Sequence, residues 1–395
     1  MNNSFVTGII QLVRSAMKGH PENLPKDLDF EMVYRFAVKQ NVVALLYSGI
    51  VNSKVELSPE LDNKFFASSA GAIAFFERQQ RGLSKIYESF DQNEIDYLPL
   101  KGAAIRSLYP QEEFRAMSDI DLLVREEQYE KISAVMKELG YEEKEEWHSV
   151  FSWRKNLLHV ELHLTPIPTD VEDYHAYYSN GWHLAKKTNE EPFHHKMSDE
   201  DCLIYVFVHL AKHYRIAGIG IRQLIDVYVL LGSCSDLDMD YIRKELEKLK
   251  LSEFFDNVVK TIKVWFEDGQ ADETTRLITN KLIGSGAFGT TEVLNQSTAV
   301  KAKKKGEVKH TRTNHLFKAL FMPYESMCTL FPILKKVPIL LPVMWAWRII
   351  YTVAFRHERL SSRIDEMKSL APNNLSRYEQ EMAAVGLNYE VEEGK

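Results

Sequence analysis

Cysteine is scarce in this chain of 395 residues. Its three cysteines, Cys202, Cys234 and Cys328, are odd in number and lie far apart. The pattern excludes the paired framework of a disulfide-rich secreted domain, and it lacks the close pairs that a structural zinc site uses. We therefore expect a protein of the reducing cytoplasm.

A strong excess of charge of one sign is also missing. The formal net charge is −7, which gives no general electrostatic footprint for nucleic acid. The one dense basic run, "KAKKK" at 301–305, is read as a solvated face. With 45% hydrophobic and 27% charged residues, the chain is globular in composition and long enough for two or three domains.

Targeting segments and uninterrupted apolar runs are lacking as well. The first twenty residues have a helical apolar period but no basic start and no cleavage site, so we expect an amphipathic helix. Residues 337–355 approach the length of a membrane span, yet two prolines and Arg348 interrupt them. We expect a buried or partner-facing helix there, with peripheral membrane contact as the alternative.

Motifs of two other enzyme classes are incomplete. His209 and His213 are four apart on a predicted helix, but the glutamate of a zinc protease is absent. Ordinary packing is the commoner role for such histidines, and lining a cleft is the alternative. The stretch "IGSGAFGTTEV" at 283–293 copies a kinase glycine-rich loop, but no H-R-D or D-F-G motif occurs. We interpret its glycines as a turn between helices.

The periodicity of apolar residues divides the chain into four regions and predicts an α+β fold. Residues 1–90 read as helical, 91–170 as a small mixed β-sheet core, and 171–310 as a larger helical domain. Residues 311–395 read as a hydrophobic helical region with a loose, charged tail. The functional cleft is expected between the sheet and the helices.

Within these regions the pattern gives individual elements. In the core it predicts strands over 95–100 and 119–124, helices over 103–109 and 126–139, and a hairpin with arms at 147–154 and 157–165. Further on it predicts a helix capped by Ser198, a helix ended by Gly232, two helices over 241–283 and a hydrophobic helical end over 316–370.

Two carboxylates stand out in "RAMSDIDLLV", residues 115–124. Asp119 and Asp121 are two apart in an apolar run, so on a strand they share one face while Ile120 points into the core. Unpartnered neighbouring carboxylates repel each other and raise each other's pKa. A bound divalent cation would remove that conflict, and Mg²⁺ prefers a few carboxylates together with water and phosphate oxygens.

A third carboxylate is available on a second predicted strand. In "LLHVELHLT", Leu158, Val160 and Leu162 point one way, and Glu161 points the other way between His159 and His163. One Asp pair with a third acid can hold two Mg²⁺ ions and clamp the oxygens of a phosphoryl displacement. Either histidine could orient Glu161 or contact base or acceptor, while an ordinary structural role is the commoner one for such histidines.

The motifs "LPLKGAAIRSLYP", "FRAMSDIDLLV", "LGYE" and "HVELHL" together resemble the polymerase-beta-type nucleotidyltransferase superfamily. More narrowly, they look like a bacterial family of largely uncharacterised nucleotidyltransferases in which Lys-Gly replaces the usual glycine pair. The likeness extends to "KQNVVALLYSGI" early in the chain and "LFPILKKVPILLPVMWAWR" near its end. The resemblance implies a Mg²⁺-dependent enzyme that uses a nucleoside triphosphate (NTP).

The resemblance also implies roles for individual residues. Asp119, Asp121 and Glu161 would be the catalytic residues and the ligands of two Mg²⁺ ions. The residues implied to contact the nucleotide are Lys101, Gly102, Arg115 and Ser118, with the Gly102 backbone at a helix N-terminus beside the triphosphate. The chain departs from the superfamily at Ala103, where a serine would help to grip phosphate. Lys101 and Arg115 are the expected compensation.

The implied reaction is nucleotidyl transfer to an acceptor hydroxyl, on a small molecule or a protein, with release of pyrophosphate. The alternative is a catalytically degenerate scaffold that docks a partner or a membrane surface through residues 316–355. Arg222 and Asp226, four apart on a predicted helix, read as a helix-surface ion pair, with phosphate contact by Arg222 as the alternative.

Overall fold

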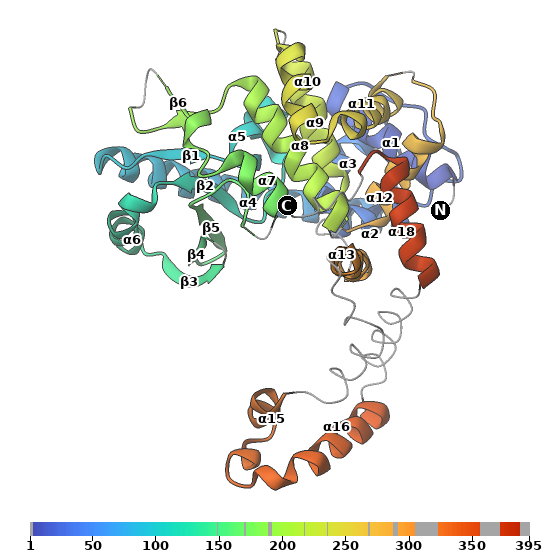
Figure 1. Cartoon of the computed structure of the whole chain (residues 1–395). Helices are drawn as coiled ribbons and strands as arrows, with labels where there is room; N and C mark the ends of the chain where they lie inside the picture. The colour runs from blue at the N-terminus through green and yellow to red at the C-terminus, as the bar shows by residue number, and fades with distance from the viewer. Residues whose placement is uncertain are drawn as a thin grey trace. The chain divides into compact units, whose positions relative to one another are not determined.

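The structure is a computed structural model of the chain, shown in Figure 1. It describes residues 3–147, 149–169, 171–188, 192–216, 218–234, 236–267, 269–286, 291–304, 323–355 and 372–387. The chain forms two compact units. Unit 1 comprises residues 1–213 and 219–288, and unit 2 comprises residues 214–218 and 289–395.

Four helices open unit 1, as the sequence predicted for residues 1–90. They are α1 (Asn3–Lys18), α2 (Phe30–Gln40), α3 (Val43–Asn52) and α4 (Pro59–Gln92). Asp29 caps α2, and Ser58 with Pro59 starts α4, which are favourable residues for a helix N-terminus. Helices α1 and α3 approach so closely that a Cβ on Gly49 would lie 2.2 Å from the Leu12 carbonyl oxygen.

The sheet of unit 1 has five strands in the order β1-β2-β5-β4-β3, with β2 and β5 parallel and the other pairs antiparallel. The strands are β1 (Tyr97–Pro99), β2 (Ile120–Val124), β3 (Glu142–Trp147), β4 (Val150–Lys155) and β5 (Leu158–His163). This confirms the predicted α+β class and the small mixed sheet. A short antiparallel pair, β6 (Lys186–Lys187) and β7 (His195–Lys196), lies beside β1, where Tyr97 forms a bridge with His194.

Helices cover one face of this sheet. Ile120, Leu122 and Val124 of β2 pack into one buried core with residues of α4 and of α6 (Tyr129–Glu138), and Figure 1 shows α6 beside the strands. Residues of β5 with the same parity, Val160 and Leu162, join this core. Asp121 and Glu161 therefore point to the opposite face, as the alternation predicted.

Several predicted boundaries in the core were wrong by a few residues. Strand β2 begins at Ile120, so Asp119 stands just before it. Strand β1 covers only 97–99 of the predicted 95–100. The predicted helix over 103–109 begins earlier, as α5 (Lys101–Ile105), and ends in a 3-10 helix (Arg106–Leu108). Short strands and tight turns of this kind are where pattern alone is least reliable.

The hairpin prediction was right about its turn and wrong about its first arm. Strands β4 and β5 pair antiparallel through a turn at Asn156. The predicted arm 147–154 is divided, because Trp147 belongs to β3 and the chain reverses before Val150. Strand β3 reads Glu-Glu-Lys-Glu-Glu-Trp, which lacks apolar alternation, since it is the charged edge of the sheet.

The remaining helices of unit 1 are α7 (Glu172–Tyr178), α8 (Asp199–Ile216), α9 (Ile221–Ser233), α10 (Met239–Lys248), α11 (Ser252–Phe266) and α12 (Glu273–Gly284). Residues 241–283 thus hold three helices where two were predicted. The Ser198 cap is confirmed, since its Oγ accepts from the Asp201 amide at 3.1 Å. Arg14 of α1 donates to the Trp265 carbonyl of α11 at 2.7 Å, so helices about 250 positions apart meet within the unit.

Unit 2 contains α13 (Thr291–Lys304), α15 (Tyr324–Leu330), α16 (Leu341–Phe355) and α18 (Pro372–Ala384). Helix α18 buries Tyr378 and Met382 and occupies part of the tail that the sequence predicted to be loose. Residues 287–290 of the turn predicted within 283–293, and the outer parts of the 316–370 segment, lie outside the described residues. In the described part of the chain, every helix is too short or too polar to cross a membrane.

Candidate active site

Asp121 lies on the face of the sheet opposite to α4 and α6, and it has the closest charged contacts of the predicted site carboxylates. It lies in the middle of β2, directly opposite Glu161 in the parallel register with β5. Its Oδ1 is 2.5 Å from Nζ of Lys101 and 2.8 Å from Nε2 of His163. The side chain is 6% exposed, so these two contacts replace water around the charge.

The partners of Asp121 determine its ionisation. Burial alone would raise the pKa of this carboxyl, but the charge of Lys101 and the hydrogen bond from His163 outweigh burial and hold the pKa below its usual value. Burial likewise lowers the pKa of Lys101, and the charge of Asp121 more than reverses that effect. The pair is therefore a carboxylate and an ammonium at neutral pH, and His163 donates from Nε2.

Asp119 has a different environment although it is only two residues away. It is half-buried in the turn before β2. Burial, and then the negative charge of Asp121, raise the pKa of Asp119, while Lys101 only partly offsets them. Lys101 therefore stabilises the charge of both aspartates, but only Asp121 is stabilised enough for its pKa to fall below the usual value.

Glu161 completes the acidic group. Its Oε1 is 3.8 Å from Nε2 of His159, and its Oε2 is 3.6 Å from Nε2 of His163. Burial raises the pKa of Glu161, but the contact with His163 and the charge of Lys101 contribute to a net lowering. His159 also lies 2.8 Å from Oγ of Ser152 on β4, which fixes its ring beside the carboxylate.

Three of these side chains are arranged as a cation site. Ligand atoms of Asp121, Glu161 and His163 all lie within 4.8 Å of one another. Two carboxylates and an imidazole suit a divalent cation. His163 was outside the predicted ligand set, although its position two residues after Glu161 placed it on the same strand face. Asp119 is outside this tight group and adjoins it.

The predicted phosphate contacts Lys101 and Gly102 lie where β1 meets α5. Lys101 has a left-handed backbone, with φ of 47°, at the first residue of that helix. Such a conformation is costly for a residue other than glycine and is typical of functional turns. At Gly102 an added Cβ would lie 2.5 Å from Sδ of Met117, so a larger residue there would force this buried side chain to shift.

Arg115 is engaged by the helices. Its Nε and Nη2 donate to the two carboxylate oxygens of Asp226 on α9 at 2.6 and 2.9 Å, and its Nη1 donates to the Ala116 carbonyl. Tyr109 donates to the same Asp226 at 2.5 Å. All of these groups are buried, so Arg115 ties the turn before the aspartates to the helices.

Arg222 is correspondingly free of the helix-surface pair predicted with Asp226. Its Nη1 donates to the Ala116 carbonyl, and its Nε is buried with no hydrogen-bond partner among the described residues. Burial and the neighbouring charge of Arg115 lower the pKa of Arg222 to about 10, and the negative charges of Asp226 and then Asp119 act in the opposite direction. Arg222 thus has a buried N–H without a partner among the described residues, and the negative charge of Asp119 acts on its guanidinium group.

Helix α8 contributes two histidines. The rings of His209 and His213 lie 4.4 Å apart. Burial, with the positive charges of Lys212 and Lys101, holds the pKa of each well below its usual value. Both are therefore neutral, and the charge of Asp121 acts in the opposite direction on His213. Ser118 is half-buried directly before Asp119, and Ala103 packs against the core of the sheet.

The family model described as uncharacterised nucleotidyltransferase matches residues 26–267. The chain belongs to this family. The resemblance carried by the Lys-Gly and Asp-Ile-Asp motifs is thereby confirmed. The match extends from α2 to the end of α11 and so includes the flanking helices as well as the sheet. No curated protein matches the chain.

Among solved structures, this nucleotidyltransferase is similar to the antibiotic-resistance factor ANT(2'')-Ia, whose solution structure reveals substrate-regulated conformation dynamics in that protein. The TM-score is 0.32 at 15% identity, over 48% of this chain and 96% of that one.

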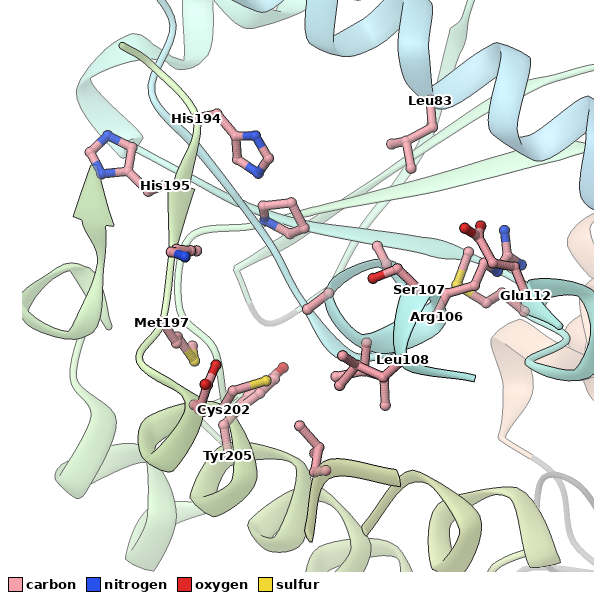
Figure 2. Close-up of a pocket in the computed structure, with 18 of the residues that line it drawn as sticks. Leu83, Arg106, Ser107, Leu108, Glu112, His194, His195, Met197, Cys202 and Tyr205 are labelled. Atoms are coloured by element: carbon pink, nitrogen blue, oxygen red, sulfur yellow. The ribbon is translucent and has the colours of Figure 1, made fainter. Parts of the chain in front are cut away.

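A cavity of about 410 Å³ lies next to helix α5 of this nucleotidyltransferase, whose residues 103–105 form part of its wall. Figure 2 shows its walls, with Leu83 from α4, Ser107 and Leu108 from the 3-10 helix, His194 beside β7, and Cys202 and Tyr205 from α8. The predicted site carboxylates do not line it. Burial raises the pKa of Cys202 to about 12, so this thiol stays protonated and is no nucleophile.

Proposed function

We propose that this nucleotidyltransferase transfers a nucleoside monophosphate from an NTP to the hydroxyl of an acceptor, a small molecule or a protein, in the cytoplasm. The observation that carries the proposal is that Asp121 of β2 lies directly opposite Glu161 of the parallel strand β5. Asp119 directly precedes the first residue of β2. Three acids so placed are costly without a cation, since Asp119 and Asp121 repel each other.

In this proposal Asp119, Asp121 and Glu161 hold two Mg²⁺ ions, and His163 orients Asp121. Bound Mg²⁺ would neutralise charge on the phosphates and on the attacking oxygen. Lys101, which contacts Asp121, and Arg222, on which the charge of Asp119 acts, bind phosphate oxygens, and Arg115 positions the turn that carries Asp119. The buried Nε of Arg222 gains the hydrogen bond that it lacks among the described residues.

The chemical step forms one bond and breaks one. The acceptor oxygen attacks the α-phosphorus in line, the bond between that phosphorus and the bridging oxygen breaks, and pyrophosphate leaves. The hydroxyl proton passes to Glu161 or to solvent. Glu161 is ionised at neutral pH, because its pKa is lowered, and can therefore accept it.

The test is incubation with each α-labelled NTP, Mg²⁺ and a cell extract. We expect label transfer that disappears in Asp119→Asn and in Asp121→Asn. Glu138→Gln, which removes an exposed acid of α6, is the matched control and should leave transfer unchanged. Transfer that persists in both Asp variants would place the chemistry elsewhere.

A catalytically degenerate scaffold is the second candidate, because two features favour it. Ala103 stands where the superfamily has serine, and the Lys101 ammonium occupies the Asp121 oxygen that a cation would use. Calorimetry of ATP binding with and without Mg²⁺ separates the two functions. An enzyme requires metal-dependent affinity for the nucleotide, whereas a scaffold shows none.

A further inference from the structure

Unit 2 exposes a cluster of apolar side chains that its own small core leaves uncovered. Half of the large apolar residues that are exposed in the described part of the chain fall between Tyr324 and Trp347. Ile339 is 84% exposed, and Val343 and Trp347 are 58% exposed. Isolated exposed apolar residues are ordinary, but a concentration of this kind marks an interaction surface.

The local fold explains why these side chains face outward. Helix α15, the 3-10 helices Pro332–Lys335 and Pro338–Leu340, and helix α16 close around a core of Met327, Cys328 and Leu334. Leu341, Met344 and Trp345 of α16 pack on that core. Val343 and Trp347 are four apart and therefore share another face of α16.

The charge of the segment that carries this face is mostly positive. Residues 323–355 contain three basic residues, Lys335, Lys336 and Arg348, and a single acid, Glu325, in a chain with a net charge of −7. Lys335 and Lys336 are exposed and lie between the exposed side chains of Ile333 and Val337. The apolar surface is thus continuous in sequence with a positive one.

We infer that this apolar and basic surface, residues 330–347 of unit 2, binds the face of a membrane that contains anionic phospholipid. Adjacent Ile, Val and Trp side chains with flanking lysines are the combination that suits the boundary between headgroups and acyl chains. A polar protein partner would leave the apolar groups in water, and a basic partner would be repelled. The inference is independent of the nucleotidyl transfer proposed above.

The mode of contact is shallow insertion from one side. Proline at positions 332, 338 and 342 keeps the segment in short helices. The exposed tips of Ile339, Val343 and Trp347 enter the lipid boundary, and Lys335 and Lys336 face phosphate groups. Trp347 suits this depth because its ring has an apolar body and an N–H donor.

The test is flotation of the full chain with vesicles of phosphatidylcholine alone and of phosphatidylcholine mixed with phosphatidylglycerol. We expect binding to the mixed vesicles and little to the neutral ones. Lys335→Gln and Lys336→Gln should each weaken binding about fivefold at low salt. Ile339→Gln together with Trp347→Gln should abolish it, since these side chains are exposed and their loss leaves the small core intact.

The matched control is Phe66→Gln, which removes an apolar side chain of α4 that is 62% exposed and should not change vesicle binding. Absence of binding to the mixed vesicles, or binding that survives the Ile339 and Trp347 double substitution, overturns the inference. The inference is also overturned if the wild-type chain forms a dimer without vesicles and the double substitution dissociates that dimer, because the surface would then bind a second copy of the chain.

Discussion

At the scale of single residues, the ammonium group of Lys101 contacts the Asp121 oxygen that a metal ion would use. The two atoms are 2.5 Å apart, and both side chains are largely buried. Removing one partner of a buried pair leaves the other charge uncompensated, which costs about 3–5 kcal/mol of unfolding free energy. We place Lys101→Met near 3 kcal/mol, because His163 remains on Asp121.

The same variant predicts a change in the response to metal. With Lys101 removed, Mg²⁺ or Mn²⁺ without nucleotide should raise the melting temperature more than in the wild type, while the affinity for ATP falls. Thermal melts with chelator and with each metal, together with ATP calorimetry, check this. Lys137→Met, at an exposed site on α6, should match the wild type. Equal metal responses in both variants would mean that Lys101 does not compete for the site.

Asp119 and Asp121 should affect stability in opposite directions when metal is absent. The pKa of Asp121 is lowered in the folded chain, so its charge stabilises the fold above about pH 4 and that contribution is lost as the pH falls below this value. The pKa of Asp119 is raised, so its charge opposes folding once the carboxyl ionises. At neutral pH, Asp119→Asn should therefore be more stable than the wild type and Asp121→Asn less stable.

Urea unfolding at pH 7 in chelator measures both changes. Repeating it at successively lower pH below 4 should shrink both differences, and the difference for Asp121→Asn should shrink more slowly, because the pKa of Asp121 in the folded chain lies well below its usual value. If Asp121→Asn is more stable than the wild type, or Asp119→Asn is less stable, then the opposite pKa shifts given for the two aspartates are wrong.

Sequence reasoning found the acidic residues because strand alternation alone assigns Asp121 and Glu161 to one face. It did not include His163 among the ligands, since an imidazole on a polar face is ambiguous until the register shows what lies opposite it. It also paired Arg222 with Asp226 by helical spacing. The structure gives Asp226 to Arg115 and Tyr109, which are more than 100 positions away, and spacing along one helix contains no information about such contacts.

At the scale of elements, the contact of α1 with α3 predicts opposite effects for two glycines. A Cβ on Gly49 would collide with the backbone of Leu12, whereas Gly71, in the exposed middle of α4, has nothing within 4 Å. Gly71→Ala should therefore stabilise the chain by about 0.5–1 kcal/mol through helix propensity alone. Gly49→Ala should destabilise it by about 1–3 kcal/mol, because the helices must separate.

Chemical unfolding of the two variants checks this pair, each serving as the control of the other. If Gly49→Ala is as stable as Gly71→Ala, the helices do not pack as closely as described.

Which elements the sequence predicted depends on how much of their pattern is local. Helix α6 was found through its apolar face and through Gly140, whose φ of +79° ends it. The parallel pairing of β2 with β5 could not be predicted, since it joins residues 40 apart around a helix and a hairpin. Strand β3 was missed because it owes its position to pairing with β4 and not to apolar alternation.

At the scale of the whole molecule, the two proposals assign different ligands to different units. Asp121, Glu161 and the arginines beside them belong to unit 1, and residues 330–347 belong to unit 2. The sequence predicted the regions 1–90, 91–170, 171–310 and 311–395, and this division stays a prediction. The hydrogen bond between Arg14 of α1 and Trp265 of α11 joins helices that are far apart in the sequence but lie in unit 1. Long-range helix packing of this kind is invisible to local periodicity.

Hydrogen exchange of the full chain should therefore give two separate footprints. ATP with Mg²⁺ should slow exchange in residues 97–125, 158–165, 205–213 and 219–226, because the nucleotide satisfies backbone and side-chain donors there and raises the free energy of local opening. Vesicles containing phosphatidylglycerol should slow exchange in 330–347 and leave those four segments unchanged. Asp121→Asn should erase the first footprint and keep the second, while Ile339→Gln with Trp347→Gln should do the reverse. A nucleotide footprint on 330–347 would contradict this separation of roles, since a surface committed to lipid has no reason to respond to Mg²⁺ and ATP.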